Sequence, residues 1–139
     1  RMYAMDDRLT SASIPLSSNE LSDSGTTKDR GKAAFVAINF IDCKTDYAER
    51  FESLFRSRAR KIDRMPGFLG MNVLKCTESG EPYLVVSYWE TEADFEAWVG
   101  SPEFHEGHRR AFADMKAFKE RGEEPPMASR FKTYTVLTD

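Results

Sequence analysis

One run of residues constrains the fold more than any other feature of this sequence. Ala33 to Ile41 is apolar at every position but one, and it is rich in β-branched and aromatic side chains. Such a run is typical of a central β-strand that is covered on both faces. It is also less than half as long as a membrane-spanning helix. We therefore expect a buried strand within a sheet and no insertion into a membrane.

The segment before this strand has a different composition. Residues 1–32 are rich in Ser, Thr, Asp and Gly and show no sustained apolar period, which predicts a flexible or arm-like N-terminal extension. Residues 33–139 have the usual length of one domain. The chain opens with Arg1 instead of Met, which suggests a processed or trimmed product. We expect a cytoplasmic protein or, if a targeting peptide has been removed, a protein of an organellar stroma or matrix.

Charge and cysteine content exclude several kinds of partner. The 20 basic and 23 acidic residues nearly balance, so the chain lacks the strong positive field that holds nucleic acid. Cys43 and Cys76 belong to no CxxC or Cys/His pattern with zinc spacing. We therefore expect no nucleic-acid partner, and two free thiols in a reducing compartment.

After the first strand, helical and strand-like patterns alternate. Asp46 and Glu49 form a plausible capping box, and apolar residues then recur at helical spacing up to Pro66. Two alternating apolar runs follow, joined by a polar turn, and indicate a β-hairpin. These patterns predict a helix over about 46–64 and strands over 68–76 and 83–89.

Two further helices and a strand complete the domain. Thr91 with Asp94 indicates a second helix start, and Gly100 ends this short helix. Ser101 and Pro102 are favoured at the start of the next helix. One stripe of that helix carries Phe104, His108, Ala111, Phe112 and Met115, and the last predicted strand is Phe131–Leu137.

The order β-α-β-β-α-β predicts the ferredoxin-like plan of the α+β class, in which helices cover one face of an antiparallel sheet. The other face also carries apolar side chains, from residues 35–41 and 83–89. A second copy of the chain is the simplest cover for this face, so we expect a homodimer.

His108 is the most informative candidate for a functional residue. It lies on the apolar stripe four residues from both Phe104 and Phe112, so its imidazole is expected to point inward. It is either a core histidine that bonds to a backbone carbonyl or a neutral imidazole that ligates iron. A metal pair with His105 would need further ligands that the sequence does not place nearby.

Three other side chains are candidates for ligand contacts. The amide of Asn39 interrupts an apolar strand and must bond either to a backbone edge or to a bound ligand. Arg58 lies on the apolar side of the predicted first helix, where it either extends to solvent or meets a ligand carboxylate. Trp98 is by itself typical of a core residue.

Together these segments resemble a known family, the antibiotic biosynthesis monooxygenase (ABM) superfamily, and within it the heme-degrading monooxygenases of the IsdG and mycobacterial type. The discriminating feature is the trio Asn39, Trp98 and His108, with the histidine ten residues after the tryptophan. The resemblance runs from about residue 34 to 137, and it implies that residues 33–139 form a domain of ABM type. It is carried by Ala37-Ile38-Asn39, Met65-Pro66-Gly67-Phe68, Tyr88-Trp89-Glu90, Asp94 to Trp98, Ser101 to Phe104 and Gly107-His108.

The resemblance implies a dimeric α+β barrel that opens the porphyrin ring of heme with O2 and releases iron. It implies that His108 ligates the heme iron, that Asn39 bonds toward the distal ligand and that Trp98 presses the porphyrin out of plane. Arg58 is similar to an arginine that contacts a heme propionate. No flavin or nicotinamide motif is visible, so electrons would come from an external donor, either a reductase or a small reductant.

The chemistry of heme agrees with the residue pattern. Heme is mostly apolar with two carboxylates at one edge, so it suits a cleft between a sheet face and the stripe that carries Phe104 and Phe112. Two other functions stay open: a cofactor-independent ABM-type oxygenase that acts on a quinol or a polyketide phenol, and a noncatalytic heme-binding protein.

Overall fold

The computed structural model describes residues 30–139. Nearly all of the predicted N-terminal extension, residues 1–32, lies outside the described residues. Its last three residues, Arg30–Lys32, form a short 3-10 helix, η2. No helix of the described part of the chain is long and apolar enough to cross a membrane.

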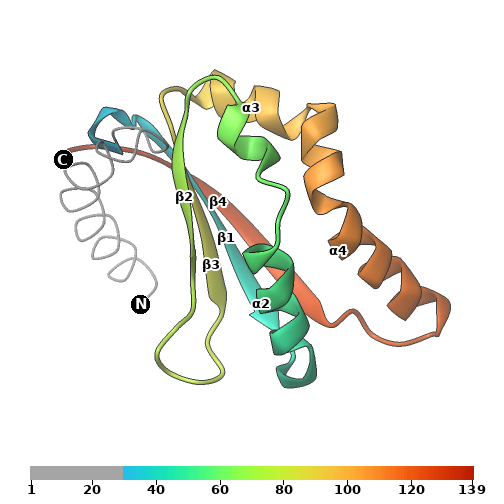
Figure 1. Ribbon diagram of the computed structural model, residues 1–139. Helices are drawn as coiled ribbons and strands as arrows, with labels where there is room; N and C mark the ends of the chain where they lie inside the picture. The colour runs from blue at the N-terminus through green and yellow to red at the C-terminus, as the bar shows by residue number, and fades with distance from the viewer. Residues whose placement is uncertain (1–29) are drawn as a thin grey trace.

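Four strands form one antiparallel sheet in the order β2-β3-β1-β4 (Figure 1). The α-helices α2, α3 and α4 all lie on one face of this sheet (Figure 1). The central strand is β1, as the apolar run predicts, and the ferredoxin-like α+β prediction is confirmed. The elements are β1 Phe35–Cys43, α2 Ala48–Arg56, β2 Phe68–Leu74, β3 Tyr83–Trp89, α3 Glu92–Val99, α4 Pro102–Glu120 and β4 Met127–Thr135.

The central strand divides its side chains between two sides of the sheet. Phe35 and Ala37 face the helices and pack in one cluster with Trp98. Val36, Ile38 and Phe40 belong to a separate cluster and are only 2–3% exposed in the single chain. The homodimer that we expected to cover this face stays a prediction.

The first helix is shorter than predicted. We expected a helix over about 46–64, but α2 ends at Arg56, and a 3-10 helix, η4 (Lys61–Arg64), follows after a turn. Arg60 has a left-handed backbone with φ 59°, which a right-handed helix cannot contain. The prediction was wrong because no glycine or proline marks this break in the sequence. Arg58 therefore follows α2 and does not lie on its apolar face.

The start of α2 also differs from the prediction. Thr45–Tyr47 form a 3-10 turn, η3, and no side chain caps either η3 or α2. Asp46 lies inside this turn, so the predicted capping box with Glu49 does not form. The backbone amide of Tyr47 already donates to the carbonyl of Lys44 at 2.9 Å, which satisfies one of the groups that a cap would serve.

The two later helices begin where the sequence predicts. The hydroxyl of Thr91 accepts a hydrogen bond from the Asp94 amide at 3.0 Å, and the hydroxyl of Ser101 accepts one from the Phe104 amide at 3.2 Å. Gly100 follows the last residue of α3. These caps place Trp98 and His108 on two successive helices with fixed starting points.

The last strand begins earlier than predicted. We expected Phe131–Leu137, but β4 spans Met127–Thr135 and pairs with β1 from Cys43↔Met127 to Phe35↔Thr135. Most of its side chains are exposed. Backbone hydrogen bonds to β1 hold this edge strand, so its first residues need no apolar side chains. The sequence therefore has no apolar pattern that would mark where the strand begins.

The turn before β2 requires a glycine. Gly67 has φ 78°, and a Cβ at this position would collide with the carboxylate of Asp94. Its carbonyl accepts a hydrogen bond from the Glu90 amide at 2.8 Å. The turn therefore joins the start of β2 to the start of the helix that carries Trp98.

A polar network attaches α2 to the sheet. Glu52 accepts a hydrogen bond from the Tyr83 hydroxyl at 2.6 Å and forms ion pairs with Lys75 at 2.8 Å and Arg56 at 3.2 Å. The hydrogen bonds from Lys75 and Tyr83 lower the pKa of Glu52 to about 2. The charged carboxylate is therefore the form that the folded chain favours.

We expect Glu52 to make the fold sensitive to acid. A carboxyl whose pKa falls on folding stabilises the fold above its unfolded pKa, and this contribution is lost as the pH falls through the folded pKa. The difference in melting temperature between the wild type and Glu52→Gln should be constant above about pH 4.5 and shrink toward pH 2. Glu49→Gln, on the same helix, controls for the loss of one charge. A difference that does not change with pH would contradict this role.

Candidate functional site

A cleft of about 710 Å³ lies between α4 and the helix-covered face of the sheet. Its floor is formed by side chains of β1, β3 and β4, and its walls by α3, α4 and the segment after α2. All six residues that the sequence analysis singled out as site residues line it. They are Asn39, Arg58, Trp98, Phe104, His108 and Phe112.

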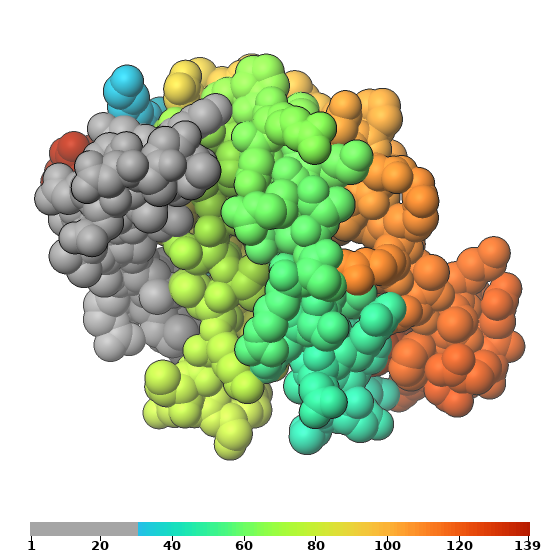
Figure 2. All heavy atoms as spheres, viewed as in Figure 1, coloured from blue at the N-terminus to red at the C-terminus, as the bar shows by residue number. Residues whose placement is uncertain are grey.

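The cleft exists because α4 does not pack closely on the sheet. No residue of α4 is buried, and the ring of Phe112 is 48% exposed. The helix lies against η4 and α3 near its start, and its residues meet those of α2 along a seam on the surface (Figure 2). The predicted stripe of α4 therefore lines a cleft, while Phe104, Ala111 and Met115 on it also pack partly against the core clusters.

His108 is oriented by its own helix. Its Nδ1 lies 2.6 Å from the carbonyl oxygen of Phe104, and because a carbonyl can only accept, Nδ1 must be the protonated nitrogen. In the neutral form of the imidazole, the lone pair of Nε2 is then left for a ligand. The imidazole lies between two aromatic rings, with centroid distances of 4.2 Å to Phe104 and 5.6 Å to Phe112.

Trp98 combines two roles in the structure. It is 7% exposed and packs with Phe35 and Phe68 in the cluster beneath α3. Its indole also lines the cleft, with a ring-centroid distance of 6.4 Å to His108. The structure therefore brings together the tryptophan and the histidine of the predicted trio, and it makes the tryptophan part of the core as well.

Two buried polar atoms in the cleft have no hydrogen-bond partner among the described residues. They are Oδ1 of Asn39, on the floor, and Nε of Arg58, beyond the end of α2. The Nη1 of Arg58 donates to the carbonyl of Phe55 at 3.3 Å, and burial lowers the pKa of this arginine. Buried polar atoms without partners are costly, so both side chains are suited to receive a polar ligand or water.

The sequence analysis missed other residues of the cleft. Phe131 of β4 is 54% exposed and stacks on Phe95 with a centroid distance of 5.6 Å. Val99 is 40% exposed. In the sequence these residues read as ordinary strand and helix positions, and only the tertiary arrangement shows that they line an open cleft.

A metal site held by protein side chains alone finds no support. Within residues 30–139, no group of three or more His, Cys, Asp or Glu side chains is placed to hold a metal ion. The alternative pair of His105 and His108 therefore lacks further ligands. Cys43 and Cys76 are both free.

Comparison with known proteins identifies relatives of this domain. The family model "Antibiotic biosynthesis monooxygenase" matches residues 34–110. A heme oxygenase (mycobilin-producing) of Mycobacterium tuberculosis is 37% identical over 76 residues, which cover 53% of this chain and 72% of the relative. A heme oxygenase (staphylobilin-producing) of Staphylococcus haemolyticus is 39% identical over 77 residues, which cover 54% and 73%.

Solved structures show the same fold. The heme-degrader MhuD of M. tuberculosis, with two hemes bound in its active site, has a TM-score of 0.55 and 28% identity, over 76% of this chain and 97% of that one. SnoaB, a cofactor-independent oxygenase from Streptomyces nogalater, has a TM-score of 0.58 and 20% identity, over 77% and 96%. At that identity, the likeness to SnoaB shows the fold alone.

Fold and cleft together define a class: a ferredoxin-like α+β protein with a largely apolar cleft that presents one imidazole. The family match covers more than half of the chain and includes Asn39, Arg58, Trp98 and His108. The chain belongs to the antibiotic biosynthesis monooxygenase family.

Proposed function

We propose that this chain is a heme-degrading monooxygenase that opens the porphyrin ring in a reaction dependent on O2 and reductant and releases the iron. The observation that carries the proposal is His108, whose Nδ1 bond to Phe104 leaves Nε2 available in an apolar cleft. The names of the two bacterial heme oxygenases and the structural likeness to MhuD support the same function.

The cleft fits heme in size and chemistry. Its volume of about 710 Å³ lies within the usual range for pockets that hold small molecules and cofactors. Exposed aromatic rings suit the apolar macrocycle, and Phe104 and Phe112, which line the cleft, would contact it. The partnerless Nε of Arg58 suits a carboxylate, with Arg60 and Lys61 lining the same region.

Each residue of the trio then has a distinct task. Nε2 of His108 would hold the iron. The indole of Trp98, 6.4 Å from the His108 ring, would limit the space beside the imidazole and press against a bound macrocycle. The amide of Asn39 can donate a hydrogen bond to negative charge that develops in the cleft. Bound heme supplies both the redox-active iron and the carbon that is oxidised, while O2 and electrons from a reductase or small reductant come from outside.

Hemin titration followed by turnover tests this function. Wild-type protein is expected to give a saturable Soret band that decays under ascorbate and O2, with open-chain tetrapyrrole products in mass spectrometry. Folded protein that fails to bind hemin would favour a cofactor-independent oxygenase that acts on a quinol or polyketide phenol. A Soret band that persists under reductant and O2 would favour a noncatalytic heme-binding protein.

We also propose that the protein is a homodimer. The edge strand β4 is exposed along most of its length, and Phe131 on it is 54% exposed at the mouth of the cleft. A second copy is a simple partner for such an edge. Sedimentation equilibrium at micromolar concentration should give twice the chain mass of 15.9 kDa. A folded monomer at that concentration would refute the dimer.

A further inference from the structure

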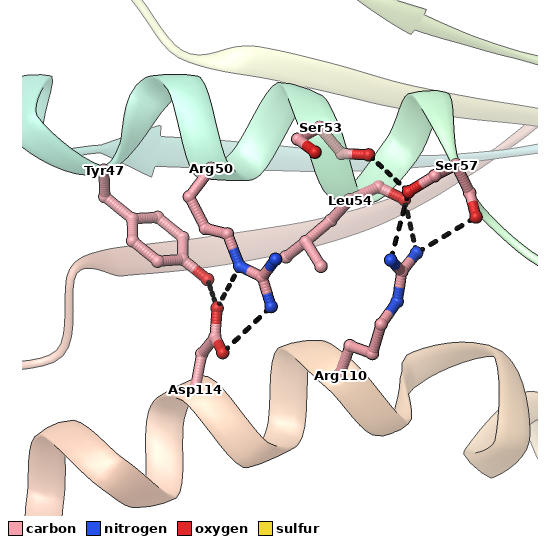
Figure 3. Close-up of polar contacts among 7 residues, drawn as sticks. All are labelled: Tyr47, Arg50, Ser53, Leu54, Ser57, Arg110 and Asp114. Carbon is pink, nitrogen blue, oxygen red and sulfur yellow. Dashed lines mark hydrogen bonds and ion pairs between the residues drawn. The ribbon is translucent and has the colours of Figure 1, made fainter.

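We propose that Asp114 and Arg110 are positioning residues that hold the wall of the cleft carrying His108 at a fixed separation from the sheet. Both lie on α4, and both bind α2 or the turns at its ends, not the sheet (Figure 3). The inference deepens the proposed function, because it concerns the helix that presents the imidazole.

The first contact is a charged clamp at the start of α2. Oδ2 of Asp114 accepts hydrogen bonds from the hydroxyl of Tyr47 at 2.6 Å and from Nε of Arg50 at 2.9 Å, and Oδ1 accepts one from Nη2 of Arg50 at 3.3 Å (Figure 3). The ring of Tyr47 is 6% exposed and meets Phe118 edge-on at 6.0 Å. The hydrogen bond from Arg50 lowers the pKa of Asp114, so the clamp is charged at neutral pH.

The second contact lies at the other end of α2. Nη2 of Arg110 donates to the carbonyls of Leu54 and Ser57, both at 3.1 Å. Nη1 donates to the hydroxyl of Ser57 at 3.0 Å (Figure 3). Carbonyls at the end of a helix lack partners within the helix and carry partial negative charge. One guanidinium therefore closes the end of α2 and fixes α4 to it.

These clamps add to packing that is only partial. Phe104, Ala111, Met115 and Phe118 of α4 lie against the core clusters, but none of them is fully buried. The side of the helix that carries His108 and Phe112 faces the cleft. Arg110 follows His108 by two residues, and Asp114 lies about 9 Å further along the helix than His108 at the usual rise per residue. A helix moves as a rigid body over this length, so a shift at either clamp moves the imidazole relative to Asn39 on the floor.

The clamp at Arg110 also connects two parts of the proposed site. The carbonyls that it binds belong to Leu54 and Ser57, and Arg58 is the next residue along the chain. These hydrogen bonds therefore connect α4, which carries His108, to the turn that carries Arg58, the proposed carboxylate-binding residue. Loss of the Arg110 hydrogen bonds is therefore expected to disturb the contacts of both His108 and Arg58 with a bound ligand.

The test compares clamp variants with matched controls in the full chain. Asp114→Asn and Arg110→Ala should each weaken hemin binding by about tenfold, the effect of losing one charge-assisted set of hydrogen bonds, and should alter the ligand-field bands of the hemin complex. Arg109→Ala and Glu123→Gln are the controls, because Arg109 pairs with Glu106 within α4 and Glu123 pairs with Arg121 at its end. Both controls should bind hemin as the wild type does.

A second measurement uses the ligand-free protein. Hydrogen exchange in residues 104–120 should become faster in the clamp variants and stay unchanged in β1 and β3, and Arg110→Lys should recover part of the protection. Tyr47→Phe removes one donor with little change in shape and should give a smaller effect in the same segment. If wild-type protein does not bind hemin, the proposed function fails. The hydrogen-exchange data still test whether Asp114 and Arg110 hold α4 in place. Clamp variants with wild-type hydrogen exchange in α4, or with a hemin affinity no different from that of the controls, would overturn the inference.

Discussion

Replacement of His108 by alanine is expected to weaken hemin binding by about a hundredfold or more and to abolish turnover, with little change in stability. The imidazole is half-buried at the cleft wall, and among residues 30–139 its hydrogen bond goes to a carbonyl of its own helix. Its loss leaves no large cavity, so the free energy of unfolding should change by less than about 1 kcal/mol. Hemin titration and urea unfolding of the same sample measure both quantities.

His105→Ala is the matched control for this prediction. His105 is exposed and lies on the same helix, where its ring contacts Phe104 and Phe112 from the outer side. Its removal should leave the hemin spectrum unchanged. If His108→Ala instead keeps the wild-type spectrum and lowers stability by several kcal/mol, His108 is a core residue, and it does not ligate the iron.

Replacement of Asn39 by alanine is expected to separate binding from turnover. Its Oδ1 is buried without a partner among the described residues, so the folded chain loses little when the amide is removed. Hemin should bind within about tenfold of the wild type, whereas turnover should fall by about a hundredfold or more, because a donor to developing charge acts mainly in the transition state. Stopped-flow decay of the Soret band under ascorbate gives the rate.

The contrast with Trp98 makes this measurement decisive. Trp98 is 7% exposed and packs with the central cluster, so its substitution changes stability and site geometry together. Asn39 has no such double role. Wild-type turnover in Asn39→Ala would show that the amide takes no part in the reaction, and a parallel loss of binding and stability would show that it is structural.

Much of the fold follows from local patterns in the sequence. The central strand, the hairpin and the starts of α3 and α4 are predicted because alternation, polar caps and turn residues act over short distances. The end of α2 was not predictable, since Arg60 adopts its left-handed conformation without a glycine to mark it. The start of β4 was missed because backbone pairing with β1 holds it.

The candidate site was predictable by residue but not by shape. Asn39, Trp98 and His108 were singled out from residue type and spacing, and all three line one cleft. The sequence could not show that α4 leaves space above the sheet. The contacts that hold this helix join Tyr47 to Asp114 and Leu54 to Arg110, residues far apart in the chain whose pairing has no local signal.

The absence of buried residues on α4 has a consequence for the evolvability of this scaffold. A side chain on a cleft wall can be exchanged at a small cost in folding free energy, whereas a core side chain cannot. Mutations that resize the cavity or change its polarity are therefore tolerated on this helix, provided that Asp114 and Arg110 are kept. The chain can thus acquire a new ligand preference through changes in one helix, while the sheet beneath it stays the same.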